Sequence, residues 1–280
     1  MPLKTRVVAV FFILLAAAAG LVAASLTSST RPYSVYNTGG DGASNLAGLP
    51  GVMVVADLSG LQGFNPASHV LITGRENPLT PAEAGYLKGF AEKGGVVIAY
   101  GSRGFTESLL EALGVGAGVK GAVYDPVYNA GDQGLVNAST VFCGTRVVLE
   151  EPYSVSPIGA AAAAAWSSPF SYIDVDGDGS YSPGEPIGSS VVAVRVDAGG
   201  GVIIVFPARG VFANSVLHYN KGLLDCIAAG RRVLVDQSEV FRDPAELLRH
   251  LIRGQVYSPL HVALLIGLVT LVLYYVYGRH

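Results

Sequence analysis

The sequence has few charges, few cysteines and no excess of basic residues, and each shortage excludes a class of protein. Charged residues make up 14% of the chain and hydrophobic residues 50%, a balance too apolar for a disordered protein. Two cysteines are too few for a disulfide-built scaffold or a four-cysteine zinc site. The net charge of −3 offers no basic surface for phosphates, so we expect no nucleic-acid partner.

The first long apolar run covers residues 7–24. It contains no charged residue and follows Lys4 and Arg6. A run of this length is enough to cross most of a bilayer core about 30 Å thick, so we predict an N-terminal transmembrane anchor over residues 1–25. A cleaved signal peptide stays the alternative, because small residues close the run.

The second run, residues 260–277, carries only His261 as an ionisable group and ends in three tyrosines before Arg279. An aromatic belt followed by a positive charge is typical of a membrane boundary, so we predict a C-terminal transmembrane helix over residues 258–278. The chain is then a two-pass cell-membrane protein with both termini cytoplasmic and the lipid bilayer as a partner. The central residues 26–256 form an extracytoplasmic domain.

The central region alternates short β-rich runs with helical patterns, which predicts an α/β fold with a mostly parallel sheet and helices on both faces. Thr80 and Glu83 form a capping box with Pro81 at the first helical position, and two glycines at 94–95 end that helix. The expected strands cover residues 52–58, 69–74, 96–101 and 231–237, with a hairpin from 190–196 to 201–208.

Two further helices are expected after the hairpin. One lies within residues 211–230, and the other begins at Asp243 and Pro244 with an acidic residue in its first turn. Residues 114–170 follow no clear order. They contain an alanine run at 160–165 and one credible strand at 145–151.

The sharpest motif is DVDGDGSYSPGE, residues 174–185, which matches the twelve-residue calcium loop of helix-loop-helix proteins. A calcium ion takes six to eight oxygens from alternate residues, and this requires a sharp turn at the sixth position, here Gly179. The expected ligands are Asp174, Asp176, Asp178, Ser180 through its carbonyl, Ser182 through a water, and Glu185 with both carboxylate oxygens.

The surroundings of the loop differ from a helix pair. Pro183 and Pro186 disfavour a helix after the loop, and residues 171–173 before it suggest an extended segment. We therefore predict a calcium loop inserted without its helices, in which a structural Ca²⁺ ion holds the loop rigid. The competing interpretation is a solvated acidic turn whose Asp and Gly residues favour tight backbone geometry.

Several segments together carry a family resemblance: RPYSVYNTGGDGASNLAGL, PLTPAEAGYLKGFAEKGGVVIAYG, DGDGSYSPGEPIG, VFPARGVFANSVLHYN and VLVDQSE. In this order they resemble the archaeal and bacterial membrane-protein family named domain of unknown function 4350. That resemblance implies a flavodoxin-like fold similar to class I glutamine amidotransferases. It also implies a partner assembly with a MoxR-type ATPase and no known reaction, with Asn214 and Asn220 at polar positions of the family.

An amidotransferase needs a cysteine nucleophile on the turn after a central strand, and here Ser102 stands at that turn without a recognisable His–acid pair. The strand-end charges Asp57, Arg103 and Asp236 mark the edge where open α/β sheets bind ligands. His69 and His218 are expected as ordinary surface or core residues. Cys226 is expected as a small core residue, and a bond between it and Cys143 stays open.

These observations favour a protein that is not an enzyme. We expect a calcium-stabilised extracytoplasmic scaffold or ligand-sensing module of a membrane complex. The alternatives are a hydrolase or transferase that uses the strand-end crevice near Ser102, and an accessory subunit of an export or transport system.

Overall fold

The computed structural model describes residues 27–116, 118–157 and 159–253, together with isolated positions 12–13, 15–16, 20, 267 and 271. These residues fall into two compact units, residues 30–239 and a second unit of residues 1–29 with 240–280. The elements of the first unit are α2 Ser44–Ala47, β1 Met53–Val55, η1 Leu58–Gly63, η2 Pro66–Ser68, β2 His69–Arg75, α3 Pro81–Glu92, β3 Val96–Gly101, α4 Arg103–Ala112, β4 Gly118–Tyr124, β5 Leu135–Thr140, β6 Arg146–Ser156, β7 Ala161–Trp166, β8 Tyr172–Asp174, β9 Val191–Ala198, β10 Gly201–Phe206, β11 Ala208–Gly210, α5 Leu217–Ala228 and β12 Arg232–Asp236.

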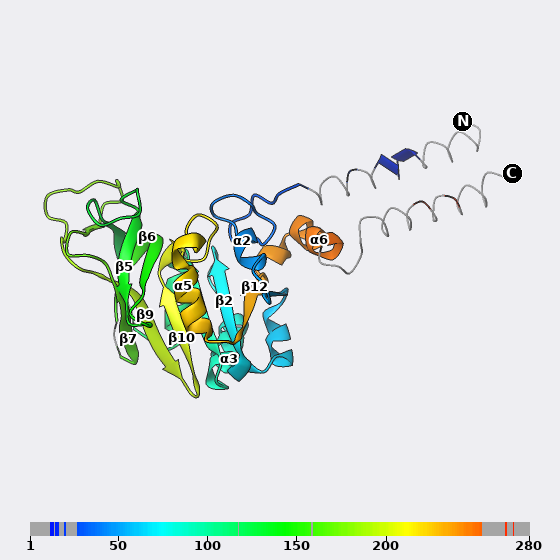
Figure 1. Cartoon of the computed structure of the whole chain (residues 1–280), viewed down its shortest axis with the longest axis horizontal. Helices are drawn as coiled ribbons and strands as arrows, with labels where there is room; N and C mark the ends of the chain where they lie inside the picture. Colours follow the sequence, from blue (N-terminus) through cyan, green and yellow to red (C-terminus); the bar gives the residue numbers. More distant parts are fainter. Residues whose placement is uncertain are drawn as a thin grey trace. The chain divides into compact units, whose positions relative to one another are not determined.

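The sheet of this unit has a parallel half and an antiparallel half (Figure 1). The parallel half runs in the order β1-β12-β2-β3-β10. The antiparallel half continues through β9-β7-β5-β6-β4-β8, and β11 pairs with β6. The predicted α/β class with a parallel sheet is confirmed, and the antiparallel half is an addition that the sequence did not reveal.

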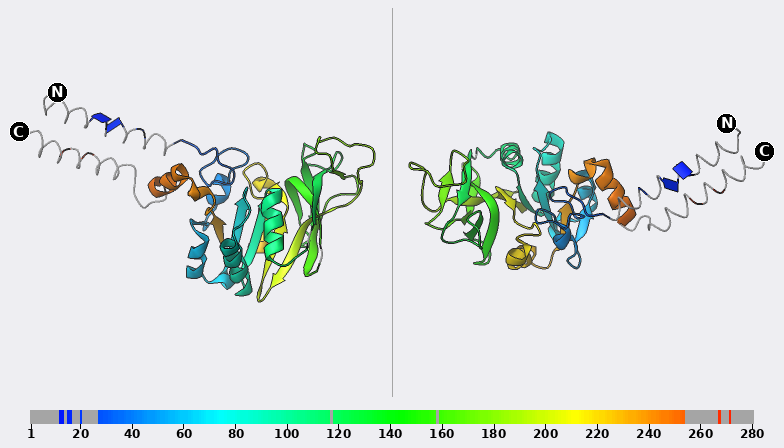
Figure 2. Two further views of the ribbon diagram at one scale, coloured as in Figure 1. Left: turned by 180° about the vertical axis from the view of Figure 1, so that it is seen from behind. Right: turned by 90° about the horizontal axis from the view of Figure 1, so that it is seen from above.

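Strand β2 is buried along its whole length, and so is β3, because both lie inside the parallel half with a layer on each face. On one face, Val97 and Ala99 join a core that contains Leu87 of α3 and Leu109 of α4. On the other face the ring of Tyr100 contacts Tyr33 at 5.6 Å and Phe212 at 6.2 Å. Figure 2 shows α3 and α4 on the side of the sheet opposite α5, so helices cover both faces as predicted.

Helix α3 begins as the sequence predicts. The hydroxyl of Thr80 accepts a hydrogen bond from the amide of Glu83, whose carboxylate in turn accepts one from the amide of Thr80 at 2.9 Å. The predicted hairpin is confirmed as β9 and β10, joined at Gly199 and Gly200. Strand β12 and helix α5 are also where the sequence predicts them.

The antiparallel half accounts for the segment without clear order. Strand β6 extends the expected strand at 145–151 as far as Ser156. Residues Ala161 to Ala165, a helix-favouring composition, instead form β7, because β7 pairs with β9 on one side and β5 on the other. Small side chains also let neighbouring layers approach this strand closely, and Ala164 and Ala165 are fully buried.

The second unit contains η3 Val240–Arg242 and the predicted final helix, α6 Pro244–Arg253. Asp243 caps α6 by accepting a hydrogen bond from the amide of Ala245 at 2.9 Å. The buried carboxylate of Glu246 accepts a hydrogen bond from Ser29 Oγ at 2.7 Å and pairs with Arg249. Burial lowers the pKa of His250.

The predicted membrane placement is not upheld. The runs at residues 7–24 and 260–277 lie outside the described residues, except for a few single positions. Within the described part of the chain, no helix is long and apolar enough to cross a bilayer. The longest described helices, α3 and α5, have 12 residues each, whereas a span needs about 20. This finding contradicts the prediction of a two-pass membrane protein with an extracytoplasmic centre.

Candidate metal centre

The acidic loop of residues 174–185 connects β8 to the segment before β9 and carries no helix on either side. Asp174 ends β8 and is only 3% exposed, because β8 pairs with β4 through Ala122. Gly177 and Gly179 have φ values of 81° and 76°, a left-handed conformation that favours glycine. The two glycines fold the chain back on itself, so that residues on both arms face one another.

Three of the six expected ligands converge. Carboxylate oxygens of Asp174, Asp176 and Glu185 all lie within 4.8 Å of one another. Two oxygens bound to one calcium ion at about 2.3–2.6 Å can be at most about 5 Å apart, so these three fit around a single ion. The arrangement could hold a metal ion between the two arms of the loop.

The fourth expected carboxylate ligand, Asp178, lies outside this cluster, and the remaining expected ligands are Ser180 and Ser182. The carboxylate of Asp178 is exposed and accepts a hydrogen bond from the amide of Ser180 at 2.7 Å. The amide of Ser182 donates a hydrogen bond to Glu185 Oε2 at 2.9 Å, and this residue is half-buried. Ser180 is exposed and follows Gly179, as a carbonyl ligand at the seventh position requires.

Backbone amides hold the converging carboxylates in place. Asp174 Oδ1 accepts from the amide of Gly177 at 2.6 Å, and its Oδ2 accepts from the amide of Gly179 at 2.9 Å. Glu185 Oε1 accepts from the amide of Val175 at 2.7 Å. Each carboxylate oxygen has a second lone pair, so these bonds orient the groups and leave them able to bind a cation.

Residues outside the loop support its turn. The carbonyl of Gly179 accepts hydrogen bonds from Gln133 Nε2 at 2.9 Å and from the hydroxyl of Tyr172 at 3.2 Å. Burial and then the nearby charge of Asp174 raise the pKa of Tyr172. The sequence motif did not indicate Gln133, because it lies 46 positions away on a different connection.

A second polar cluster lies at the ends of β2 and β12, around the buried side chain of Arg75. Arg75 Nε donates to Asp236 Oδ2 at 3.0 Å, and its Nη1 pairs with Glu83 Oε1 at 2.7 Å. Thr73 also donates to Asp236, at 2.8 Å, and Ser238 accepts from Arg75. The sequence indicated Asp236 as a strand-end charge and Glu83 only as part of the capping box, and it did not indicate Arg75.

The protonation states of this cluster follow from its contacts. Burial acts to raise the pKa of Glu83, but hydrogen bonds from Thr80 and Arg75 outweigh it and lower that pKa to about 2. The carboxylate of Asp236 and hydrogen bonding to Glu83 raise the pKa of Arg75 despite its burial. The charges satisfy one another inside the protein, so the cluster joins α3, β2 and β12.

The remaining strand-end residues make local contacts. Ser102 is the N-cap of α4: its hydroxyl accepts from the amide of Phe105 at 3.1 Å and donates to the carbonyl of Glu76. Arg103 bonds Glu107 and the carbonyl of Val119. Asp57 caps η1, His69 bonds the carbonyl of Asn65, and the ring of His218 contacts the ring of Tyr219 at a tilt of 42°.

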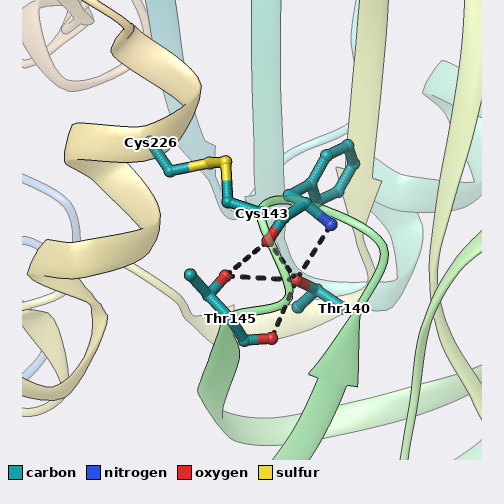
Figure 3. Close-up of a disulfide and its surroundings, with 5 residues drawn as sticks. Thr140, Cys143, Thr145 and Cys226 are labelled. Atoms are coloured by element: carbon teal, nitrogen blue, oxygen red, sulfur yellow. Dashed lines mark hydrogen bonds between the residues drawn. A yellow bond between two sulfur atoms is a disulfide. The ribbon is translucent and has the colours of Figure 1, made fainter.

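The two cysteines form a disulfide between Cys143 and Cys226, with Cα atoms 6.5 Å apart (Figure 3). Cys143 lies on the exposed β5–β6 turn, where its φ is 51°, and Cys226 lies on α5. Hydrogen bonds among Thr140, Phe142 and Thr145 hold the turn. The bond therefore fixes the antiparallel half to the helix that covers the parallel half.

No family model and no curated protein matches this chain. Among solved structures, the mmIFT52 N-terminal domain is similar over 61% of this chain and 78% of its own, with 17% identity and a TM-score of 0.43. The β-galactosidase from Bacillus circulans sp. alkalophilus is similar over 57% of this chain, with 12% identity and a TM-score of 0.35. The β-galactosidase from Rahnella sp. R3 has 13% identity to this chain and a TM-score of 0.34.

This chain covers 22% and 23% of the lengths of the two galactosidases. All three scores are too low to carry an argument about what this chain does.

Proposed function

We propose that this chain is a non-catalytic binding module whose antiparallel half is held together by a structural calcium ion. It acts as a scaffold or ligand-sensing subunit of a larger assembly. The observation that carries the proposal is the convergence of Asp174, Asp176 and Glu185 within the twelve-residue calcium register. A match in sequence alone also fits a solvated acidic turn, and the convergence favours the ion.

Calcium suits this site because all the donors are oxygens and the loop is irregular. Calcium accepts six to eight oxygens in flexible geometry, whereas Mg²⁺ demands near-ideal octahedral geometry and keeps several waters. Asp174, Asp176 and Glu185 would hold the ion, and Asp178 would complete the shell after a change of its side-chain rotamer. Bound calcium would offset the repulsion among these carboxylates and fix the loop to β8.

The strand order supports a relationship to the flavodoxin-like folds, which include the class I glutamine amidotransferases. In a flavodoxin-like sheet the strands lie in the order 2-1-3-4-5. The parallel half has the order β1-β12-β2-β3-β10. If β12 is numbered as the first strand and β1, β2, β3 and β10 as the second to fifth, this order becomes 2-1-3-4-5. The renumbering corresponds to a circular permutation. Partners, among them the MoxR-type ATPase that the family resemblance implies, remain part of the proposal.

The alternative of a hydrolase or transferase at Ser102 gains no support from the contacts of this residue. Across the described ranges its hydroxyl bonds only Glu76 and Phe105, and no histidine contacts it. A nucleophilic serine needs a general base within hydrogen-bond reach. The hydroxyl serves instead to cap α4.

Calorimetric titration of the purified chain with Ca²⁺ tests the proposal. We expect one ion per chain, and Glu185→Gln should abolish the heat signal because it removes a carboxylate ligand. Asp225→Asn is the matched control, since this exposed carboxylate lies outside the loop and pairs with Lys221 on α5. Equal titration curves for wild type and Glu185→Gln would contradict the proposal.

The assembly is tested by purification from native cells with mass spectrometry of the proteins that remain bound. We expect at least one partner in stoichiometric amount. A solitary chain would contradict a role as scaffold or subunit.

A further inference from the structure

A cavity of about 390 Å³ opens beside the acidic loop. Its wall consists mainly of aromatic and apolar side chains: Pro126, Gln133, Phe170, Tyr172, Tyr181 and Ile187. The volume lies at the lower end of the range for small-molecule sites, about 300–1,000 Å³. Ser180 also lines it, so the metal loop and the cavity share one wall.

The aromatic rings of the cavity present their faces at different angles. Tyr172 and Tyr181 have ring centroids 5.7 Å apart and planes 75° apart, so they form two adjoining walls. Tyr124 stacks behind Tyr172 at 5.7 Å and supports it. Tyr181 is 50% exposed, Phe170 58% and Ile187 63%, although large apolar side chains are usually covered. These surfaces are available to a ligand.

The segment of the chain that forms the cavity is acidic. Residues 118–190 contain eight of the 21 Asp and Glu residues of the chain but only two of its 18 Lys and Arg residues, Lys120 and Arg146. The remaining residues are basic on balance, with 16 against 13. Arg146 lies over the ring of Tyr128 at 5.4 Å and is not part of the cavity wall. The cavity is therefore lined mainly by aromatic and apolar side chains and lies within an acidic segment of the chain.

We propose that this cavity binds an organic cation, an alkylammonium group, against the exposed rings of Tyr181 and Phe170, beside the buried ring of Tyr172. Aromatic faces attract a cation through their negative quadrupole, and the surrounding carboxylates add a favourable field. An anionic ligand is disfavoured by the same charges. A neutral ligand would gain nothing from them. The proposal goes beyond the calcium site. Four of the eight carboxylates lie in the metal loop, so an ion bound there would offset part of this field and leave the ring faces as the main attraction.

Titration of the full chain with choline and with its uncharged carbon analogue, dimethylbutanol, tests the proposal. The two probes have the same shape, so a difference between them reports the charge alone. We expect choline to bind about threefold to tenfold more tightly, the range that cation–π contacts give. Equal binding of both probes, or no binding of choline, would overturn the proposal, and this comparison needs no variant.

A variant locates the site. Tyr181→Leu keeps an apolar side chain but removes the ring face, and it should weaken choline binding by about threefold or more. Tyr219→Leu is the matched control, because Tyr219 is equally exposed but lies on α5 and does not line the cavity. Unchanged choline binding in a folded Tyr181→Leu chain, checked by circular dichroism, would overturn the assignment.

Two further probes identify the source of the cation. A short peptide with one lysine is compared with the same peptide acetylated on that lysine, which removes the charge. Tighter binding of the lysine peptide than of choline would assign the site to a side chain of a partner protein. Tighter binding of choline would assign it to a free amine. Either ranking supports recognition of an organic cation.

Discussion

Arg75 and Asp236 form an ion pair that is buried from water on both sides, with 3.0 Å between Nε and Oδ2 and 1% exposure of each side chain. The pair joins the ends of β2 and β12, two strands more than 150 residues apart in the chain. Because Glu83 of α3 contacts the same guanidinium, one buried side chain links three elements. Removing the Arg75 side chain leaves the carboxylates of Asp236 and Glu83 without this cation.

We expect Arg75→Met to destabilise the chain by about 3–5 kcal/mol, because a buried ion that loses its partner retains its full desolvation cost. Urea unfolding of the wild type and the variant measures the difference. Arg195→Met is the control: the pair between Arg195 and Asp197 is exposed, so its loss should cost at most about 1 kcal/mol. Equal losses in the two variants would show that Arg75 is not the central link.

The low pKa of Glu83 predicts a dependence of stability on pH. Folding lowers this pKa from 4.5 to about 2, so the carboxylate contributes stability fully above the unfolded value. That contribution is lost as the pH falls through 4.5 towards 2. Urea midpoints over this range should therefore fall more steeply for the wild type than for Glu83→Gln, which has no proton to gain. If the urea midpoints of the wild type and of Glu83→Gln fell in parallel as the pH is lowered, a charged Glu83 in the folded state would be contradicted.

The parallel half and the calcium register could be predicted from the sequence. The capping box around Pro81 fixes the start of α3, and the short apolar runs within β2 and β3 suffice to identify buried strands. The antiparallel half could not be predicted in the same way. Its strand β7 consists almost wholly of alanine, and only pairing with β9 and β5 makes this segment extended.

The candidate site was predictable in part for a related reason. Ligand spacing within residues 174–185 is local information, so the motif is visible in the sequence. The contact of Gln133 with Gly179, the clustering of Arg75 with Asp236 and the bond between Cys143 and Cys226 all join distant positions. Such contacts depend on the completed fold and leave no local signal.

Gly121 of β4 positions the metal loop through close packing against β8. A Cβ atom at this position would lie 1.8 Å from the carbonyl oxygen of Asp174, so Gly121→Ala must separate the two strands. We expect the variant to bind Ca²⁺ at least about tenfold more weakly, since loss of about 1.4 kcal/mol in positioning a ligand corresponds to that factor.

Gly118→Ala on the same strand is the matched control for this change. A Cβ atom at Gly118 meets no atom within 4 Å, so calcium binding should be unaffected. Calorimetric titration of both variants separates the two outcomes. Equal calcium affinity in Gly121→Ala and Gly118→Ala would mean that β4 does not position Asp174.

The disulfide predicts a dependence of stability on redox conditions. Reducing a bond that closes a long loop returns conformational entropy to the unfolded chain and typically costs about 2–4 kcal/mol. The cysteines are 83 positions apart, so the reduced protein should unfold at a clearly lower urea concentration. A double variant, Cys143→Ser with Cys226→Ala, should match the reduced wild type and be insensitive to reductant. A midpoint unaffected by reductant in the wild type would contradict a stabilising bond.

The stability of the full chain with Ca²⁺ and with a chelator tests the central claim most directly. If calcium binds only the folded loop, unfolding in urea should require about 2.7 kcal/mol more free energy at a calcium concentration one hundred times the dissociation constant. The same experiment on Glu185→Gln should show no gain. Identical unfolding curves of the wild type with calcium and with chelator would contradict the claim that an ion holds Asp174, Asp176 and Glu185 together.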